Sequence, residues 1–195
     1  MILEAIITTT MPDGSVHISP MGPIISDGFS RFELRPFEGS QTLANLRSSR
    51  AGVLHVTDDV MLFAQAVSNC WVERPELARA RAIDGWIVTD ACRWYEFEVS
   101  FMEQSTSRCS LQCNTVAEGI GRDFFGFNRA KHAVLEAAIV VSRRDFLPSS
   151  EIDAHLERAA TIVAKTGGQK ELAALDLLVQ CIKKYSPSSK SLAQS

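Results

Sequence analysis

A run of alternating side chains at residues 93–101 constrains the fold of this chain more than any other sequence feature. A period of two residues is typical of a β-strand with one buried and one solvated face. The polar turn at residues 103–106 and the segment 107–117 predict an antiparallel partner strand, so a long hairpin is expected. The predicted buried residues are Tyr95, Phe97, Val99 and Phe101, and the predicted solvated residues are Trp94, Glu96, Glu98 and Ser100.

Further strands and short helices precede this hairpin. The apolar residues 2–8, the turn Pro12-Asp13-Gly14 and the alternating residues 16–19 predict a first hairpin, which runs into an irregular Pro- and Gly-rich loop at residues 20–28. The remaining predicted elements are strands at residues 31–37, 52–57 and 86–89, short helices at 41–46 and 60–68, and an exposed Arg-rich helical turn at 75–82.

The C-terminal part of the sequence has helical periodicity. Asn128 is a good N-cap for a helix at residues 129–143, whose inward stripe consists mostly of small residues. Ser150 is expected to cap the next helix, and Gly167-Gly168 separates it from a last one. We therefore expect a barrel domain at residues 1–147, a C-terminal helical hairpin at 148–185 and a mobile tail at 186–195.

Composition narrows the function classes. The chain has 195 residues, of which 46% are hydrophobic and 22% charged, and its net charge of −3 gives no general field for nucleic acids. No apolar run approaches the length of a membrane helix, so no membrane partner is expected. The start Met1-Ile2-Leu3-Glu4 lacks the pattern of a secretory signal, and the five cysteines are scattered and odd in number. These features predict a cytoplasmic protein with reduced thiols.

Several familiar catalytic and binding motifs are incomplete. Gly119-Ile120-Gly121 follows a strand, but Phe124 replaces the third small residue of a dinucleotide fingerprint, so these glycines are better interpreted as a loop or strand bend. His55 with Asp58 and Asp59, or Cys109 with Cys113, does not make a full set of metal ligands at a known spacing. No metal site is predicted.

The segment at residues 35–46 is the strongest local constellation. A helix N-terminus supplies unpaired N–H groups, Ser40 and Thr42 supply hydroxyl donors, and Arg35 supplies a full positive charge. This combination favours a phosphate site. The alternative is that Ser40 only caps the helix and Arg35 lies on a solvated strand face, and the segment alone leaves both interpretations open.

The arrangement of these motifs resembles the FMN-binding split β-barrel of flavin reductases over residues 1–145. The resemblance rests on residues 18–24 at a strand end and on Ser40-Gln41-Thr42 with Asn45 in the following helix. The segments 35–37, 57–60 and 126–134 look more specifically like the family catalogued as domain of unknown function 447. The resemblance implies a mainly β fold with α-helices, an antiparallel split β-barrel plus the C-terminal helical hairpin, which binds FMN as a homodimer.

The same resemblance implies the site residues. Backbone N–H groups of the strand-end segment would reach the polar edge of the flavin ring, and a second set would bind the phosphate. Thr57 and Asp58 are weaker candidates for ribityl or ring contacts. The strand-end residues are Ser19, Pro20, Met21, Gly22 and Ile24, and the phosphate residues are Arg35, Ser40, Thr42 and Asn45.

Asn128, Arg129 and His132 are further candidates, because they open a helix that is expected to meet the site from the same or the partner subunit. The alternative for Asn128 is a helix cap, and the alternative for Arg129 is a surface charge. No catalytic residue is assigned by the resemblance.

The sequence thus favours an FMN-binding protein, with an oxidoreductase activity on an unidentified small molecule and an unidentified electron donor as the first hypothesis. The alternatives are a non-catalytic flavin carrier and an accessory protein of one-carbon or pterin metabolism. The flavin would perform the redox chemistry, while the protein would orient it.

Overall fold

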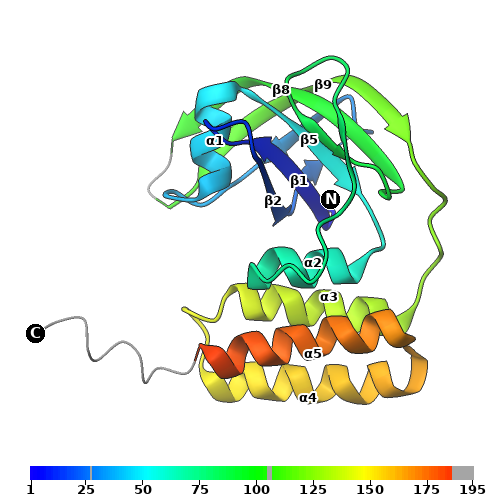
Figure 1. Ribbon diagram of the computed structural model, residues 1–195. Helices are drawn as coiled ribbons and strands as arrows, with labels where there is room; N and C mark the ends of the chain where they lie inside the picture. Colours follow the sequence, from blue (N-terminus) through cyan, green and yellow to red (C-terminus); the bar gives the residue numbers. More distant parts are fainter. Residues whose placement is uncertain (27, 105–106, 186–195) are drawn as a thin grey trace, which may run out of the picture. The chain divides into compact units, whose positions relative to one another are not determined.

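The computed structural model describes residues 1–26, 28–104 and 107–185 (Figure 1). The chain packs into two compact units. The barrel unit comprises residues 1–58 and 74–125, and the helical unit comprises residues 59–73 and the chain from residue 126 onward. The expected mobile tail at 186–195, with parts of the expected loop at 20–28 and turn at 103–106, lies outside the described residues.

A seven-stranded antiparallel sheet forms the barrel unit, in the order β2-β1-β5-β8-β9-β4-β3. The bridge between Ile2 and Ile24, and the 3.1 Å hydrogen bond from the Leu3 N–H to the Pro23 carbonyl, return β3 to the start of the chain. The sheet therefore curls into the expected split barrel. Its strands are β1 (Ala5–Thr10), β2 (Val16–Met21), β3 (Ile24–Ile25), β4 (Arg31–Leu34), β5 (Ala51–Val56), β8 (Arg93–Gln104) and β9 (Cys109–Ile120).

The barrel core is lined by the inward faces of β5, β8 and β9. Tyr95, Phe97 and Val99 are buried, as their alternation predicts. The prediction for Phe101 is wrong, because a register shift between Val99 and Phe101 acts as a bulge and reverses the alternation. Phe101 is consequently 57% exposed, while Met102 packs against the core.

The prediction that Glu96 faces solvent is also wrong. Its carboxylate is fully buried and accepts hydrogen bonds from the backbone N–H groups of Arg81, at 3.0 Å, and Ala82, at 2.7 Å. The segment that covers it connects β6 (Leu77–Arg79) and β7 (Trp86–Val88), which pair as a two-stranded sheet in place of the expected exposed helical turn. Tertiary pairing overrides the local helical preference here.

Gly119 permits a close approach within the β8–β9 hairpin. It lies in β9 opposite Trp94, whose ring fills the place of a side chain: a Cβ at Gly119 would lie 2.1 Å from Trp94 Cζ2. The glycine is therefore a packing requirement of a strand, in agreement with the interpretation that these glycines are not a dinucleotide fingerprint.

His55 joins three strands inside the barrel unit. Its Nε2 accepts the Val88 N–H at 3.0 Å, so its Nδ1 carries the proton and donates to the Ile6 carbonyl at 3.3 Å. The ring is fully buried, and desolvation lowers its pKa from 6.5 to about 4. His55 thus links β5 to β1 and β7 as a neutral imidazole.

The described residues also form five helices. In the barrel unit, α1 (Gln41–Ser49) has the expected cap, Ser40. Asp59 caps α2, and Asn128 caps α3 as predicted. α4 begins at Ser149 with Pro148 as its N-cap, so the prediction of Ser150 is wrong. The helical unit contains α2 (Val60–Ser68), α3 (Arg129–Ser142), α4 (Ser149–Thr166) and α5 (Gln169–Lys184).

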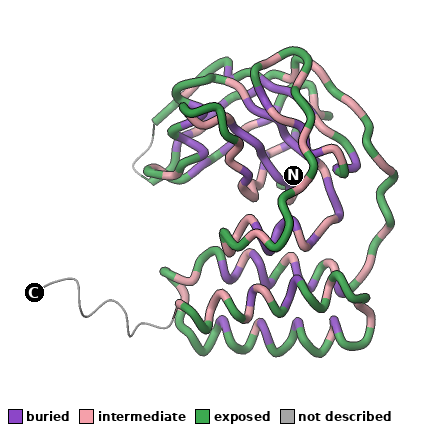
Figure 2. The backbone as a smooth tube through the Cα atoms, in the orientation of Figure 1, coloured by how far each residue is buried: buried purple, intermediate pink, exposed green. Residues whose placement is uncertain are grey.

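Small residues let the helices of the helical unit pack closely. Ala130, Ala133, Ala137 and Ala138 of α3 are buried, and α2, α4 and α5 contribute to the same core (Figure 2). The structure therefore groups α2 and α3 with the C-terminal helices, a division different from the boundary expected at residue 147. None of the helices in the described ranges is long and apolar enough to cross a bilayer.

We predict that His55 makes the stability of the protein depend on pH. Between pH 6.5 and about 4 the unfolded chain binds a proton at His55 that the folded chain does not bind, so the free energy of unfolding falls as the pH falls. The expected loss is on the order of 3 kcal/mol. Urea unfolding at several pH values measures it.

The variant His55→Gln is the control, because glutamine supplies a donor and an acceptor without titrating. Its free energy of unfolding should lack this part of the pH dependence. Parallel curves for the two proteins would contradict the prediction.

Candidate functional site

Three polar side chains meet where α1 packs on β2, and we call them the hydroxyl cluster: His17, Ser19 and Thr42. His17 and Ser19 are two residues apart in β2 and therefore share a face of the strand. The Thr42 hydroxyl, in the first turn of α1, lies 2.8 Å from Ser19 Oγ and 3.2 Å from His17 Nε2. The structure thus brings the predicted residues Ser19 and Thr42 together, although they are far apart in the sequence.

Burial determines the charge of this cluster. Thr42 is almost fully buried, and burial lowers the pKa of the half-buried His17. The His17 imidazole is consequently neutral at pH 7. The hydroxyl cluster is a chain of neutral donors and acceptors, to which sequence reasoning assigned Ser19 and Thr42 but not His17.

The N-terminus of α1 adds favourable electrostatics for an anion. Ser40 has extended backbone and its Oγ accepts the Leu43 N–H at 3.3 Å, so it caps the helix. The first turn contains no acidic residue. Helix N-termini carry partial positive charge on their N–H groups, and this one is not neutralised by a carboxylate of its own first turn.

Asn45 has a structural part in the same helix. Its amide nitrogen donates to Thr9 Oγ1 at 2.9 Å, and its amide oxygen accepts from Gln41 Nε2 at 2.8 Å. The residue is 2% exposed. Its polar atoms tie α1 to β1.

Arg35 lies on the outer side of β4 and β9. Its guanidinium forms a two-pronged ion pair with Glu33, with Nε–Oε1 at 2.6 Å and Nη2–Oε2 at 3.2 Å, and Ser110 Oγ donates to Glu33 Oε1 at 2.7 Å. The hydrogen bond from Arg35 lowers the pKa of Glu33. The Arg35 side chain is 54% exposed, so it is held at the surface by Glu33.

The strand-end segment is more regular than the predicted loop. Ser19, Pro20 and Met21 belong to β2, and Ile24 belongs to β3, where it pairs with Glu33. β2 is the first strand in the sheet order and has β1 as its partner, so its other side is a sheet edge. An edge strand presents backbone donors and acceptors and tolerates a proline such as Pro20.

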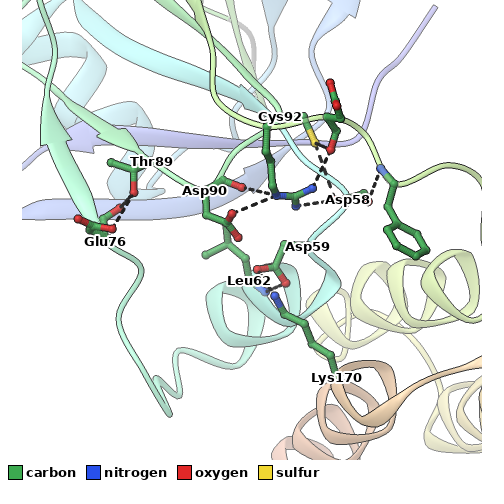
Figure 3. Close-up of polar contacts among 11 residues, drawn as sticks. Asp58, Asp59, Leu62, Glu76, Thr89, Asp90, Cys92 and Lys170 are labelled. Atoms are coloured by element: carbon green, nitrogen blue, oxygen red, sulfur yellow. Dashed lines mark hydrogen bonds and ion pairs between the residues drawn. The ribbon is translucent and has the colours of Figure 1, made fainter.

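Asp58 ties together the two segments at which the chain leaves the barrel unit. Its carboxylate lies 2.6 Å from Arg122 Nη2 and accepts the Phe125 N–H at 3.1 Å, and the Cys92 thiol points to it (Figure 3). Arg122 also contacts the Asp90 carboxylate at 3.1 Å. Asp58 and its neighbour Thr57 are buried. The structure therefore gives Asp58 an internal ion pair, whose partner Arg122 sequence reasoning missed.

The other predicted residues belong to the helical unit. Asn128 caps α3 through its Oδ1, and its Nδ2 donates to the Thr166 carbonyl at 3.1 Å, as the capping alternative expects. A pocket of about 550 Å³ opens beside it. It is lined by Phe127, Asn128, Arg129, His132, Ala133, Glu136 and Ile162.

This pocket combines an apolar wall with polar and charged side chains. The rings of Phe127 and His132 are 5.9 Å apart, and Arg129 and Glu136 bring opposite charges. Arg129 and His132 thus line one pocket, as two neighbours in the first turn of a helix can. Sequence reasoning did not identify Phe127, whose position before the cap was the available signal.

Two family models match the chain over most of its length. The model of the N-terminal domain of the protein family of unknown function DUF447 matches residues 3–122, and the second DUF447 model matches residues 128–180. None of the curated proteins matches the chain.

Solved structures share the fold. The chain resembles the FMN-bound DUF447 protein of Methanosarcina mazei with a TM-score of 0.80 and 20% identity, over 92% of this chain and 94% of that one. Over 60% of this chain it resembles two further structures. The first is the 2-nitrobenzoate 2-nitroreductase of Pseudomonas fluorescens, with 64% of that chain covered, 17% identity and a TM-score of 0.50. The second is the styrene monooxygenase flavin reductase of Pseudomonas putida, with 77% of that chain covered, 14% identity and a TM-score of 0.50.

We predict that Asp58→Asn destabilises the barrel unit. The amide retains an acceptor for the Phe125 N–H but removes the charge that faces Arg122, so the free energy of unfolding should fall by roughly 1.5–3 kcal/mol. Asp90→Asn is the matched control, because Asp90 contacts the same guanidinium from an exposed position. It should cost less than about 1 kcal/mol. Equal losses in chemical denaturation would contradict the assignment.

Proposed function

Because the chain belongs to the DUF447 family, we propose that its barrel unit binds FMN and serves an oxidoreductase reaction on a small molecule. The hydroxyl cluster beside the N-terminus of α1 carries the proposal. The FMN-bound relative from Methanosarcina mazei supports it, because the two chains share their fold over nearly their full lengths.

The side chains near α1 fit the phosphate of FMN. A phosphate needs several donors and no nearby carboxylate, and the N-terminus of α1 has Ser40, Thr42 and a first turn without acidic residues. Ser19 extends the set of hydroxyls from β2. We assign the phosphate to this end of the barrel, with Ser40 and Thr42 as contacts and with Asn45 holding α1 in place.

Arg35 would supply the positive charge after exchanging its partner. Its present partner is the Glu33 carboxylate, and water and salt weaken this ion pair from the exposed side of Arg35. A phosphate offers the same two-pronged geometry with more charge. We therefore propose that the Arg35 guanidinium turns from Glu33 to the phosphate when FMN binds.

The edge of β2 would position the ring. Residues 19–21 of β2 present backbone groups along a sheet edge, which is the geometry needed to hold the polar edge of a planar heterocycle. FMN, when bound, supplies hydride or electron transfer, while the chain binds and orients it. We propose that the pocket with Phe127, Arg129 and His132 takes part in binding the substrate or electron donor.

A flavin carrier is the second candidate. The observation that favours it is the composition of the hydroxyl cluster, because its Ser19 and Thr42 hydroxyls are suited to hold a phosphate but carry no charge. Steady-state oxidation of NADH or NADPH with added FMN distinguishes a reductase from a carrier.

We propose the cytoplasm as the location, in keeping with the five free cysteines.

We also propose that the protein is a homodimer, and light scattering on a sizing column tests this. Exposed apolar side chains on the barrel unit, among them Ile2 and Ile120 at 67% and 65% exposure, would be covered by a second copy. The expected mass is twice 21.5 kDa at micromolar concentration. A monomer would contradict this part of the proposal.

We predict that the protein binds FMN more tightly than FAD or riboflavin, measured by flavin fluorescence. The site has one cluster of phosphate donors, and riboflavin lacks the phosphate. Arg35→Ala should weaken FMN about tenfold to a hundredfold through the loss of a charge-assisted hydrogen bond. Thr42→Val removes one neutral hydroxyl and should weaken FMN about two- to tenfold. Riboflavin affinity should stay the same in both variants.

Glu33→Gln is the matched control, since it removes the competing partner of Arg35. It should leave FMN affinity unchanged or raise it. Equal binding of FMN and riboflavin by the wild-type protein would refute the phosphate site. An FMN affinity that is unchanged in Arg35→Ala would show that Arg35 only pairs with Glu33 and does not contact the phosphate.

A further inference from the structure

We propose that Cys70 and Cys181 are a peroxide-sensitive thiol pair that closes to a disulfide in the helical unit. The proposal does not depend on flavin binding, because both residues belong to the helical unit, whereas the hydroxyl cluster belongs to the barrel unit. It concerns a pocket of the helical unit that is lined by two cysteines.

The five thiols fall into two groups. Cys92, Cys109 and Cys113 are buried in the barrel unit, and burial raises the pKa of the Cys113 thiol. Cys70 is exposed and Cys181 is half-buried. Oxidation of a thiol requires access by the oxidant, so the second group is the reactive one.

Both reactive thiols line the same pocket of about 230 Å³. Cys70 follows the end of α2 and Cys181 lies in the last turns of α5, and these helices share the core of the helical unit. The remaining lining residues are Ser68, Arg144, Leu177, Gln180, Lys184 and Tyr185. The fold thus places two cysteines, far apart in the sequence, on one small cavity.

The loop that carries Cys70 has a defined conformation. Asn69 is in the left-handed region, with φ of 51°, and the Cys70 N–H donates to the Gln65 carbonyl at 3.3 Å. The Gln65 side chain is buried and its Oε1 accepts the N–H groups of Val72, at 2.8 Å, and Glu73. The loop is therefore anchored on both sides of Cys70, which keeps this thiol at the pocket.

Arg144 gives the pocket a cation beside one sulfur. Its Nη1 lies 4.0 Å from Cys181 Sγ, and its guanidinium lies over the Tyr185 ring at 4.6 Å. Its Nε is buried and, among the described residues, has no hydrogen-bond partner. The guanidinium is a donor beside this sulfur, and an oxygen added to the sulfur would be an acceptor for Nε.

The proposed chemistry uses hydrogen peroxide as the oxidant. The Cys181 sulfur attacks one peroxide oxygen, the O–O bond breaks, and the leaving hydroxide takes the thiol proton to become water. The Cys70 sulfur then attacks the sulfur of the resulting sulfenic acid, the S–O bond breaks, and a second water leaves. Two thiols and one peroxide thus give one disulfide and two waters.

Peptide mapping of the full chain after treatment with hydrogen peroxide tests the proposal. The expected product is a Cys70–Cys181 cross-linked peptide that has lost two hydrogens, within one chain, and the titratable thiols should fall from five to three. The buried cysteines serve as internal controls. Dithiothreitol should restore all of them.

Single variants separate the two roles. In Cys70→Ser, Cys181 should gain one oxygen and be trapped by dimedone, whereas in Cys181→Ser, Cys70 should react more slowly. Arg144→Gln should slow the loss of thiols about five- to tenfold, because a charge-assisted contact is removed. Independent oxidation of the two thiols, a link between chains, or no reaction would overturn the proposal.

Discussion

The path of the chain through the barrel unit depends on the contacts of the Asp58 carboxylate with Arg122 and Phe125. Asp58 is the last residue of the first barrel segment, and Phe125, whose N–H it accepts, is the last residue of the second. One buried carboxylate therefore holds both places where the chain leaves the barrel unit. Arg122 neutralises it, which is necessary because an uncompensated buried charge is strongly destabilising.

Asp59 stabilises the start of the helical unit in a similar way. Its carboxylate accepts the N–H groups of Met61 and Leu62 at the N-terminus of α2 and forms a 2.8 Å ion pair with Lys170 of α5. Two consecutive aspartates thus serve different units (Figure 3). Each satisfies a helix end or a loop that would otherwise present unpaired backbone groups.

The polar groups of the candidate flavin site differ from those of Asp58 and Asp59, because they can exchange their partners for a ligand. The Ser19 and Thr42 hydroxyls already bond to one another, and Arg35 already has a carboxylate partner, so the polar groups are satisfied within the chain. A ligand would therefore replace their present hydrogen-bond partners, since these groups are not unpaired before it binds. Such an exchange depends on the difference between two sets of hydrogen bonds, which favours a strongly charged group such as a phosphate over a neutral one.

The sequence by itself determined the elements whose physics is local. The period of two in β8, the capping residues Ser40, Asp59 and Asn128, and the small-residue face of α3 act over a few neighbouring residues, and the structure contains each of them. The resemblance of the motifs to a split barrel added the topology. These signals are readable because backbone geometry and capping depend on residues near in sequence.

Tertiary structure decided what depends on distant partners. Glu96 is buried because the segment before β7 supplies N–H groups to it, residues 77–79 are a strand because β7 pairs with them, and Phe101 is exposed because of a bulge. Asp58 forms its ion pair with Arg122, which lies 64 positions later in the sequence. No local pattern encodes these contacts, because the energy that selects them arises only when the sheet has formed and distant polar groups must be paired inside it.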